Sequence, residues 1–388
     1  MMSATEKKQC CGCGACMAVC PHGCIHMEAD EEGFSYPCRD TKHCVDCGLC
    51  DQICPMRRQN PVGEEETGFY VLYHREEEKR LRGSSGGVFE ALCRAALEEG
   101  GAVAGVAMDR DGYSASFQVA EDMEQARRLF GSKYVQADTN QAFARLSELT
   151  KQGKRVLVSG TPCQIAAMQS FPGLTNEGIT YVDVVCHGVP SPKAFVKYMK
   201  ELEAQKDSKV TEVSFRDKSF GWRNFSLKVT FSDKWEELRS HRKDPYMRLF
   251  LRDLILRPSC YSCPFRTIRR TSDLTLADCW GVRGLCEDLD DDKGLSLVMV
   301  HTKRGDELLQ GLIESGRLTG RKLSGDRVLA ANPSLTGQPV IREERSACFE
   351  ALDRLTIEEL AGQYAGRSLK EQIREKISNV RRRLRAIF

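Results

Sequence analysis

The chain has 388 residues, of which 41% are hydrophobic and 29% are charged, and its formal net charge is +2. This balance is typical of a globular protein with two or three domains, and it excludes wholesale disorder and collagen. An ordinary cytosolic enzyme does not concentrate thiols as this chain does, with 11 of its 19 cysteines in the first 54 residues. The N-terminus lacks the apolar stretch of a signal peptide, and no apolar run approaches the ~18–20 residues of a membrane span. We therefore expect a cytoplasmic protein whose reduced cysteines bind metal.

Two cysteine runs share the spacing C-x2-C-x2-C-x3-C, and a proline follows each. They are Cys10, Cys13, Cys16 and Cys20, and then Cys44, Cys47, Cys50 and Cys54. This spacing is typical of bacterial ferredoxins with two 4Fe–4S clusters, in which three close thiolates bind one cluster and the fourth reaches the other. Residues 1–60 are thus expected to form a ferredoxin domain, with Cys54 completing the first set and Cys20 the second. Zinc also binds CxxC pairs, but the doubled order argues against it.

Cys11, Cys24 and Cys38 lie outside both runs, and we expect them to be small buried or surface residues near the clusters, since cysteine packs well as a small apolar residue. Residues 61–67, which are polar and contain proline and glycine, predict a linker.

After the linker, apolar strand-like runs alternate with helical patterns. Strands are expected at 68–74, 102–108, 155–160 and 179–185, and helices at 87–99, 141–151, from about 163, and at 192–206. Such alternation predicts a substantially parallel sheet covered by helices. Segments 212–217 and 224–231 indicate an antiparallel hairpin, and 295–302 is expected to be the last clear strand. We expect one domain over 68–315 and a helical region over 316–388.

Four later cysteines are candidates for a third metal site. In an open parallel sheet, ligands gather beyond the carboxyl ends of the strands, where Cys163 and Cys186 are expected. Cys260 and Cys263 form a CxxC pair, and together the four thiolates match the number that a further cluster needs. The alternative makes Cys163 a nucleophile, with its pKa lowered by a helix N-terminus and His187 as base. Cys93 is expected to lie in the core.

Small-residue turns are candidates for binding phosphate. One turn precedes a helix, whose positive N-terminus favours anions; a second ends a strand, and a lysine that could pair with a pyrophosphate lies between them. These residues are Ser84, Ser85, Gly86 and Gly87, then Ser132 and Lys133, then Ser159, Gly160 and Thr161. Most such turns are only turns. No G-x-G-x-x-G motif follows a strand, so a Rossmann nicotinamide site has no support.

Charged residues beside aromatics have two interpretations. Arg216, Asp217, Lys218 and Trp222 could face a substrate or cofactor, or they could form the salt-bridged end of a hairpin. Asp278 carries the same ambiguity. The acidic run at 287–292 is expected to be a solvated loop.

Eight segments give the chain a family resemblance. They are SSGGVFEAL (84–92), GSKYVQ (131–136), SGTPCQIAAM (159–168), DVVCHGVPSP (183–192), FRDKSFGW (215–222), CYSCPF (260–265), SDLTLADCWG (272–281) and DDKGLSLVMV (291–300). Over about 68–302 the chain resembles the coenzyme F420 hydrogenase/dehydrogenase beta-subunit family. The resemblance implies FAD, one 4Fe–4S cluster, and electron transfer between iron–sulfur centres and an organic two-electron carrier such as coenzyme F420. Where the family often has Gly-Asp-Phe-Trp-Gly, this chain has Cys279 in place of the aromatic, which we expect to reshape the pocket.

We therefore predict a bacterial-type ferredoxin fused to a mixed α/β flavin-binding domain and a basic C-terminal helix. The function expected is that of an iron–sulfur flavoprotein oxidoreductase with a redox partner protein and a small-molecule or coenzyme substrate; a non-catalytic electron-transfer subunit is the alternative. The helix at 366–388 is amphipathic and carries a local charge of +6. It is expected to pack on its own domain, with a partner or anionic lipid as alternatives. No nucleic-acid partner is expected.

Overall fold

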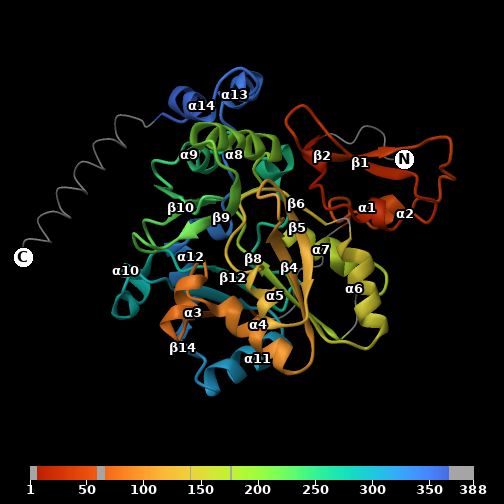
Figure 1. Ribbon diagram of the computed structural model, residues 1–388. Helices are drawn as coiled ribbons and strands as arrows, with labels where there is room; N and C mark the ends of the chain where they lie inside the picture. The colour runs from red at the N-terminus through yellow and green to blue at the C-terminus, as the bar shows by residue number, and fades with distance from the viewer. Residues whose placement is uncertain (1–6, 59–65, 140, 175–176, 367–388) are drawn as a thin grey trace, which may run out of the picture.

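The computed structural model describes residues 7–58, 66–139, 141–174 and 177–366 (Figure 1). The expected basic helix at 366–388 and most of the expected linker lie outside these ranges. Among the helices of the described residues, none combines the length and the apolar composition needed to cross a membrane.

The N-terminal module is small and built around the two cysteine runs. It contains η1 (Lys7–Gln9), α1 (Ala15–Ala18), β1 (Ile25–Ala29), β2 (Ser35–Arg39) and α2 (Leu49–Gln52). β1 and β2 pair antiparallel, with Ile25 opposite Arg39. Each single-turn helix follows a glycine in the left-handed region, Gly14 with φ 70° and Gly48 with φ 74°. Glycine adopts this conformation without steric cost, so each cysteine run can turn tightly at the same place.

The main body is a nine-stranded mixed sheet. Its order is β14 (Leu318–Leu323), β3 (Gly68–His74), β13 (Ser296–Val300), β12 (Leu274–Asp278), β8 (Ile179–Val184), β7 (Val156–Gly160), β4 (Ala102–Met108), β5 (Ala115–Ala120) and β6 (Ala137–Asp138). The central strands β12, β8, β7 and β4 are parallel, while β5, β13, β3 and β14 each pair antiparallel with a neighbour. β5 also pairs parallel with β6 at one edge, so the expected parallel sheet is confirmed at its centre and in this short edge pair.

The structure corrects the expectation that 295–302 is the last strand. β14 follows it and pairs with β3, so the region expected to be helical after residue 315 begins inside the sheet. β14 is an edge strand of mostly polar sequence, LTGRKL, and only Leu318 in it is buried. An edge strand of this kind lacks the apolar run that identifies a buried strand in sequence.

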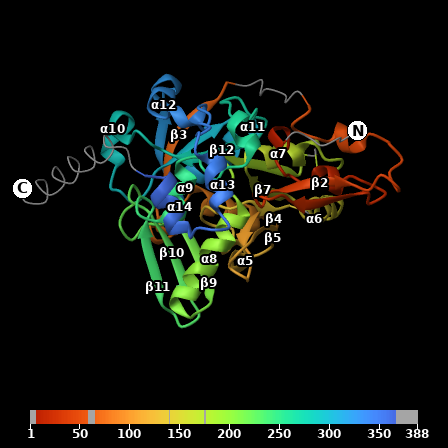
Figure 2. The same cartoon turned by 90° about the horizontal axis from the view of Figure 1, so that it is seen from above.

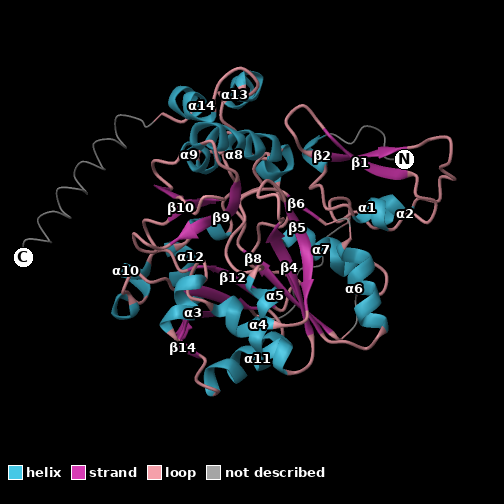
Figure 3. Ribbon diagram, viewed as in Figure 1, coloured by secondary structure: helices cyan, strands magenta, loops and turns pink. Residues whose placement is uncertain are grey.

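Helices cover both faces of this sheet (Figure 3). α4 (Val88–Glu98), α5 (Met123–Arg127) and α11 (Lys303–Glu314) share one apolar core, and α6 (Ala142–Lys151) and α7 (Pro162–Ser170) share another. Alternate residues of β4 serve the two cores: Val103 and Ala107 pack with α4, and Ala102 and Ala104 pack with α6. The remaining elements near the sheet are α3 (Glu77–Arg82), α10 (Val282–Leu285), η3 (Glu287–Leu289), α12 (Gly325–Ala331) and η4 (Pro333–Leu335).

A second, three-stranded sheet lies beside the main one (Figure 2). The expected hairpin is confirmed as β9 (Val210–Asp217) and β10 (Ser226–Phe231), and β11 (Glu236–Ser240) adds a strand that the sequence did not predict. This sheet packs with α8 (Pro192–Lys206), α9 (Pro245–Leu251), α13 (Arg345–Ala351) and α14 (Ile357–Tyr364) in one core. The connecting η2 (Pro258–Ser262) carries the later CxxC pair toward the N-terminal module, in contact with η1.

Candidate functional site

The first cysteine set lines one small cavity of the N-terminal module. Cys10, Cys13, Cys16 and Cys54 surround it, so the fourth cysteine of the second run does reach the first three of the other run. Burial, followed by the charges of Cys10 and Cys54, raises the pKa of Cys16 to about 12. Four cysteines around one cavity are the ligand number that a 4Fe–4S cluster takes, and bound iron would supply the positive charge that keeps their thiols ionised. The donor set therefore fits a 4Fe–4S cluster.

The second set lines a larger cavity of about 290 Å³, formed by Cys20, Cys44, Cys47 and Cys50. This site is closer to solvent, because Cys47 is exposed and the neighbouring Val45 side chain is 61% exposed. The crossed arrangement expected from the spacing is thus present in both cavities. Cys24, expected to be a packing residue, is buried and also lines this cavity.

The four later cysteines come together at the carboxyl ends of β7 and β8. Cys163 is in the first turn of α7 and Cys186 follows β8, while Cys260 lies in η2 and Cys263 directly after it. Burial, then the charges of Cys163 and Cys263, raises the pKa of Cys186 to about 12. Burial, then Cys186, likewise raises the pKa of Cys260. The charges of these cysteines therefore act on one another, and their number and shared location fit the ligands of a cluster.

The surroundings of Cys163 do not favour the alternative in which it is a nucleophile. A hydrogen bond with Cys11 and then burial raise the pKa of Cys163 well above its usual value, whereas a nucleophile needs a lowered one. The proposed base His187 has its Nε2 2.8 Å from Asp253 Oδ1.

Cys11 is the cysteine whose place the sequence did not reveal. Its side chain is hydrogen-bonded with both Cys13 and Cys163, so it lies between the first set and the third. Nothing in the spacing marks this residue, because the contact joins segments about 150 residues apart. Cys38, by contrast, lies on the β1–β2 hairpin with its thiol donating to Glu28 at 3.1 Å, and Cys93 is fully buried in the core as expected.

A cavity of about 300 Å³ lies beside the third cysteine set. Its lining includes nine of the ten residues proposed to bind a phosphate-bearing cofactor: Ser84, Ser85, Gly87, Ser132, Lys133, Ser159, Gly160, Thr161 and Asp278. Cys11, Cys13, Cys163 and Cys186 line the same cavity. The structure therefore brings the small-residue turns and two cysteine sets to a single space.

The tenth residue, Gly86, belongs to the small-residue turn at residues 84–87, called the first turn from here on, and is packed against neighbouring strands. Its N–H donates to Ser296 Oγ at 2.9 Å, and a Cβ at this position would lie 2.5 Å from the carbonyl oxygen of Leu72. The turn is joined to the 131–133 segment by Ser84, whose Oγ accepts from the N–H of Ser132 at 2.7 Å. Gly87 then begins α4 with φ 82°. The cradle at the N-terminus of this 11-residue helix leaves room for an anionic group.

Lys133 lies at the junction of this cavity and a second one of about 570 Å³. Its Nζ donates to the carbonyl oxygens of Phe130 and Gly131, at 2.7 and 3.1 Å. Burial lowers the pKa of Lys133 to about 7. The two cavities share five residues, Ser84, Phe130, Gly131, Ser132 and Lys133. The second is also lined by five arginines, Arg82, Arg110, Arg127, Arg128 and Arg216, which outnumber its acidic residues Asp109 and Glu212. The combined extent and charge of the two cavities fit a long ligand with phosphate groups, as FAD is.

Comparison with known proteins bears on this arrangement. The family model described as "Coenzyme F420 hydrogenase/dehydrogenase, beta subunit N-term" matches residues 69–144, and the model for the C terminus of the same beta subunit matches residues 153–325. The chain belongs to the coenzyme F420 hydrogenase/dehydrogenase beta-subunit family. Membership confirms the expected resemblance and supports an oxidoreductase role in electron transfer.

No curated protein matches the chain. Among solved structures, the chain is similar to one chain of the F420-reducing NiFe hydrogenase complex from Methanosarcina barkeri, studied as a xenon derivative. The two are 17% identical with a TM-score of 0.47, and the match covers 68% of this chain and 85% of the other.

Asp278, in the motif where this chain departs from the usual family sequence, is engaged by the protein itself. Its two carboxylate oxygens accept hydrogen bonds from Arg216, both at 2.9 Å, and one also accepts from Trp222 Nε1 at 2.8 Å. Arg216 further donates to the carbonyl oxygen of Ser84 at 3.1 Å. Both interpretations of this segment hold in part, because Arg216 forms a buried ion pair and also lines the second cavity. Asp278 therefore positions Arg216, and Arg216 in turn holds the carbonyl oxygen of Ser84 in the first turn.

Cys279 does not line either cavity that meets at this turn, which corrects the expectation that it reshapes the pocket. The side chain is fully buried in the core between the sheet and α12, where its thiol hydrogen-bonds with that of Cys286. Its neighbour Trp280 stacks on Trp222 with ring centres 4.7 Å apart. The change from an aromatic to cysteine is thus accommodated in the core.

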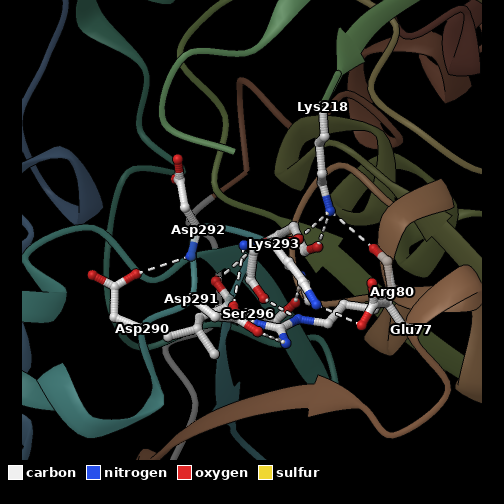
Figure 4. Close-up of polar contacts among 12 residues, drawn as sticks. Glu77, Arg80, Lys218, Asp290, Asp291, Asp292, Lys293 and Ser296 are labelled. Atoms are coloured by element: carbon white, nitrogen blue, oxygen red, sulfur yellow. Dashed lines mark hydrogen bonds and ion pairs between the residues drawn. The ribbon is translucent and has the colours of Figure 1, made fainter. Parts of the chain in front are cut away.

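The acidic run is not simply a solvated loop (Figure 4). Asp291 accepts both terminal nitrogens of the buried Arg80, at 2.8 and 2.6 Å, and Arg80 Nε donates to the carbonyl oxygen of Gly294. Lys218 Nζ donates to three carbonyl oxygens, those of Arg80, Ser85 and Lys293, at 2.9, 2.5 and 3.0 Å. Because Ser85 belongs to the first turn, these contacts hold the loop and the turn together.

Proposed function

We propose that this protein is an iron–sulfur flavoprotein oxidoreductase, with FAD in the two joined cavities and three 4Fe–4S clusters at the three cysteine sets. The observation that carries the proposal is the shared lining of one cavity by the small-residue turns and by Cys13, Cys163 and Cys186. A cofactor bound there would lie against two cysteine sets at once, and short distances between redox centres are what electron transfer requires.

The different solvent exposure of the three cysteine sets suggests the order in which electrons pass through their clusters. The second set includes the exposed Cys47, so a redox partner protein would exchange electrons there. The first set and then the third lead from it to the flavin cavity, with Cys11 between these two. Clusters carry one electron at a time, and a flavin can combine two for reaction with an organic substrate or coenzyme. Coenzyme F420 is one candidate, and a cytoplasmic setting would keep the thiols reduced.

Within this scheme the chain's own residues have distinct tasks. The amides at the start of α4 and the ammonium group of Lys133 would bind the diphosphate, and Ser84 and Ser132 would fix the distance between the two segments that carry them. Asp278 and Arg216 would position the first turn.

The proposal is tested by composition. Protein purified without oxygen is expected to contain about twelve irons and about one FAD per chain, since each of three cubanes contains four irons. Stoichiometric zinc without flavin would contradict it. Turnover of a small molecule by the isolated chain with dithionite as reductant would identify an enzyme; flavin reduction without turnover would identify a relay subunit.

The affinity for FAD is expected to fall as the pH rises above about 7. Lys133, with a pKa lowered by burial to about 7, is half protonated there in the free protein. Only the protonated form attracts a diphosphate, so binding takes up a proton above this pH and weakens as protons become scarce. Lys133→Met should weaken FAD binding at pH 6 by about tenfold, the loss of one charge-assisted hydrogen bond, and should flatten the pH dependence. Titration of apoprotein with FAD measures both.

Lys151→Met is the matched control, because Lys151 is an exposed lysine at the end of α6 that lines neither cavity. It should leave the pH dependence unchanged. A Lys133→Met protein that keeps the wild-type slope would show that another group binds the diphosphate.

A further inference from the structure

Arg257 joins the first and third cysteine sets. Its backbone is part of the third site: its N–H donates to the carbonyl oxygen of Val189 at 2.8 Å, and its own carbonyl oxygen accepts from the N–H of Cys260 at 2.9 Å. Its side chain extends away from that site into the N-terminal module and is completely buried. One residue therefore contacts two parts of the chain about 250 positions apart in sequence.

The guanidinium group of Arg257 contacts both the carbonyl oxygen and the sulfur of Cys10. Its Nε donates to the carbonyl oxygen of Cys10 at 2.7 Å, and its Nη2 lies 3.5 Å from the Cys10 sulfur and 3.0 Å from the carbonyl oxygen of Ser35. Nη1 donates to Gln136 Oε1 at 3.0 Å, and the ring of Tyr36 lies 4.3 Å from the guanidinium carbon. The cation is thus placed against a sulfur that belongs to the first set.

Gly12 makes this placement possible. A Cβ at Gly12 would lie 2.8 Å from Arg257 Nη1 and 2.5 Å from Gln136 Nε2, and Gly12 has a φ of 71°. A glycine inside the first cysteine run therefore leaves the space that the guanidinium group occupies, in addition to allowing the turn.

The acceptors that the structure gives Arg257 are oxygens of carbonyl and amide groups, the Tyr36 ring and the Cys10 sulfur. A fully buried cation supported by neutral acceptors is costly unless a negative charge lies nearby. Arg39, which donates to Cys44 Sγ at 3.6 Å in the second set, shows the contrast, because it is also paired with Asp46 at 2.7 Å. An iron–sulfur cluster bound by the four thiolates of the first set would supply the negative charge that Arg257 needs.

We propose that Arg257 is a positioning residue that raises the reduction potential of the cluster at the first set and fixes its place relative to the third. The inference rests on the proposed function. Reduction adds an electron to a cluster that is already negative, and a buried cation with an N–H directed at sulfur stabilises the reduced form more than the oxidised form. The first cluster would thereby be able to accept an electron from the exposed second cluster while remaining coupled to the third.

The test is a potentiometric titration of the holoprotein, followed by electron paramagnetic resonance, for wild type, Arg257→Met and Arg257→Lys. In Arg257→Met we expect one of the three midpoint potentials to fall, with at least a tenfold change in the equilibrium constant for reduction, which is 59 mV for a one-electron couple. Arg257→Lys keeps the charge but loses the planar fork, so a smaller shift in the same direction is expected.

Arg345→Gln is the matched control. Arg345 also joins the N-terminal module to the body, through Glu32 at 2.8 and 2.6 Å and the carbonyl oxygen of Leu256 at 2.7 Å, but these partners are oxygens and not sulfur. It should leave all three potentials unchanged. An equal shift in Arg345→Gln, or unchanged potentials in both Arg257 variants at full iron content, would overturn the inference while leaving the proposed function intact. A wild-type protein without three clusters would overturn the proposed function instead.

Discussion

Cys260→Ala protein is expected to lose about four of about twelve irons per chain and to stop passing electrons between the ferredoxin module and the flavin. Cys260 is held inside the third set, where the N–H of Val189 points at its sulfur from 3.4 Å and burial raises the thiol pKa. With three thiolates left, the cubane has no fourth protein ligand. The first and second clusters should remain, since neither site includes Cys260.

Iron analysis and rapid mixing with dithionite measure the two effects. The flavin should then be reduced at the rate of direct encounter with the reductant and no longer through the clusters. Cys348→Ala is the matched control, because Cys348 is equally small, is 1% exposed and lies in the apolar core of the second sheet. A Cys260→Ala protein with the full iron content would contradict the assignment of the third cluster. Cys163→Ala tests the remaining alternative, since a nucleophile could be removed without loss of iron.

The sequence predicted best where the geometry is local. The spacing within each cysteine run specifies which sulfurs can meet, so the crossed sets built from Cys20 and Cys54 could be anticipated from the spacing alone. The prediction that Cys163 and Cys186 lie close together followed from a general property of parallel sheets, whose strands have their carboxyl ends at the same edge. The strands 68–74 and 102–108 were predicted at their observed bounds because apolar residues dominate both runs and most residues of each are buried.

Contacts between distant segments could not be predicted in this way. Cys11 meets Cys163, and Arg257 meets Cys10, because the N-terminal module packs against the body of the protein, in part through Ala15 and Ile53 in the core of α6 and α7. Charge patterns were equally uninformative about partners. The same composition that indicated a solvated acidic loop also suits a loop whose Asp291 holds a buried arginine.

Asp278→Asn is expected to reduce the free energy of unfolding by about 3 kcal/mol or more and to weaken FAD binding. The Asp278 and Arg216 side chains are 16% and 5% exposed, and the pair is bidentate. An amide keeps the hydrogen bond from Trp222 but removes the charge, so Arg216 is left as a buried cation without its carboxylate, and breaking such a pair costs about 3–5 kcal/mol. Because Arg216 also holds the carbonyl oxygen of Ser84, the first turn should loosen with it.

The exposed pair of Asp288 and Arg321 provides the comparison. It is also bidentate, at 2.7 and 2.6 Å, but the two side chains are 60% and 46% exposed. Solvent screens such a pair, so Asp288→Asn should cost at most about 1 kcal/mol and leave FAD binding unchanged. Chemical denaturation of both apoproteins and titration with FAD distinguish the two variants. Equal stability losses would show that burial does not strengthen the Asp278 pair. An unchanged FAD affinity in Asp278→Asn would separate this pair from the first turn, and Ser84 would then be positioned by its contact with Ser132 alone.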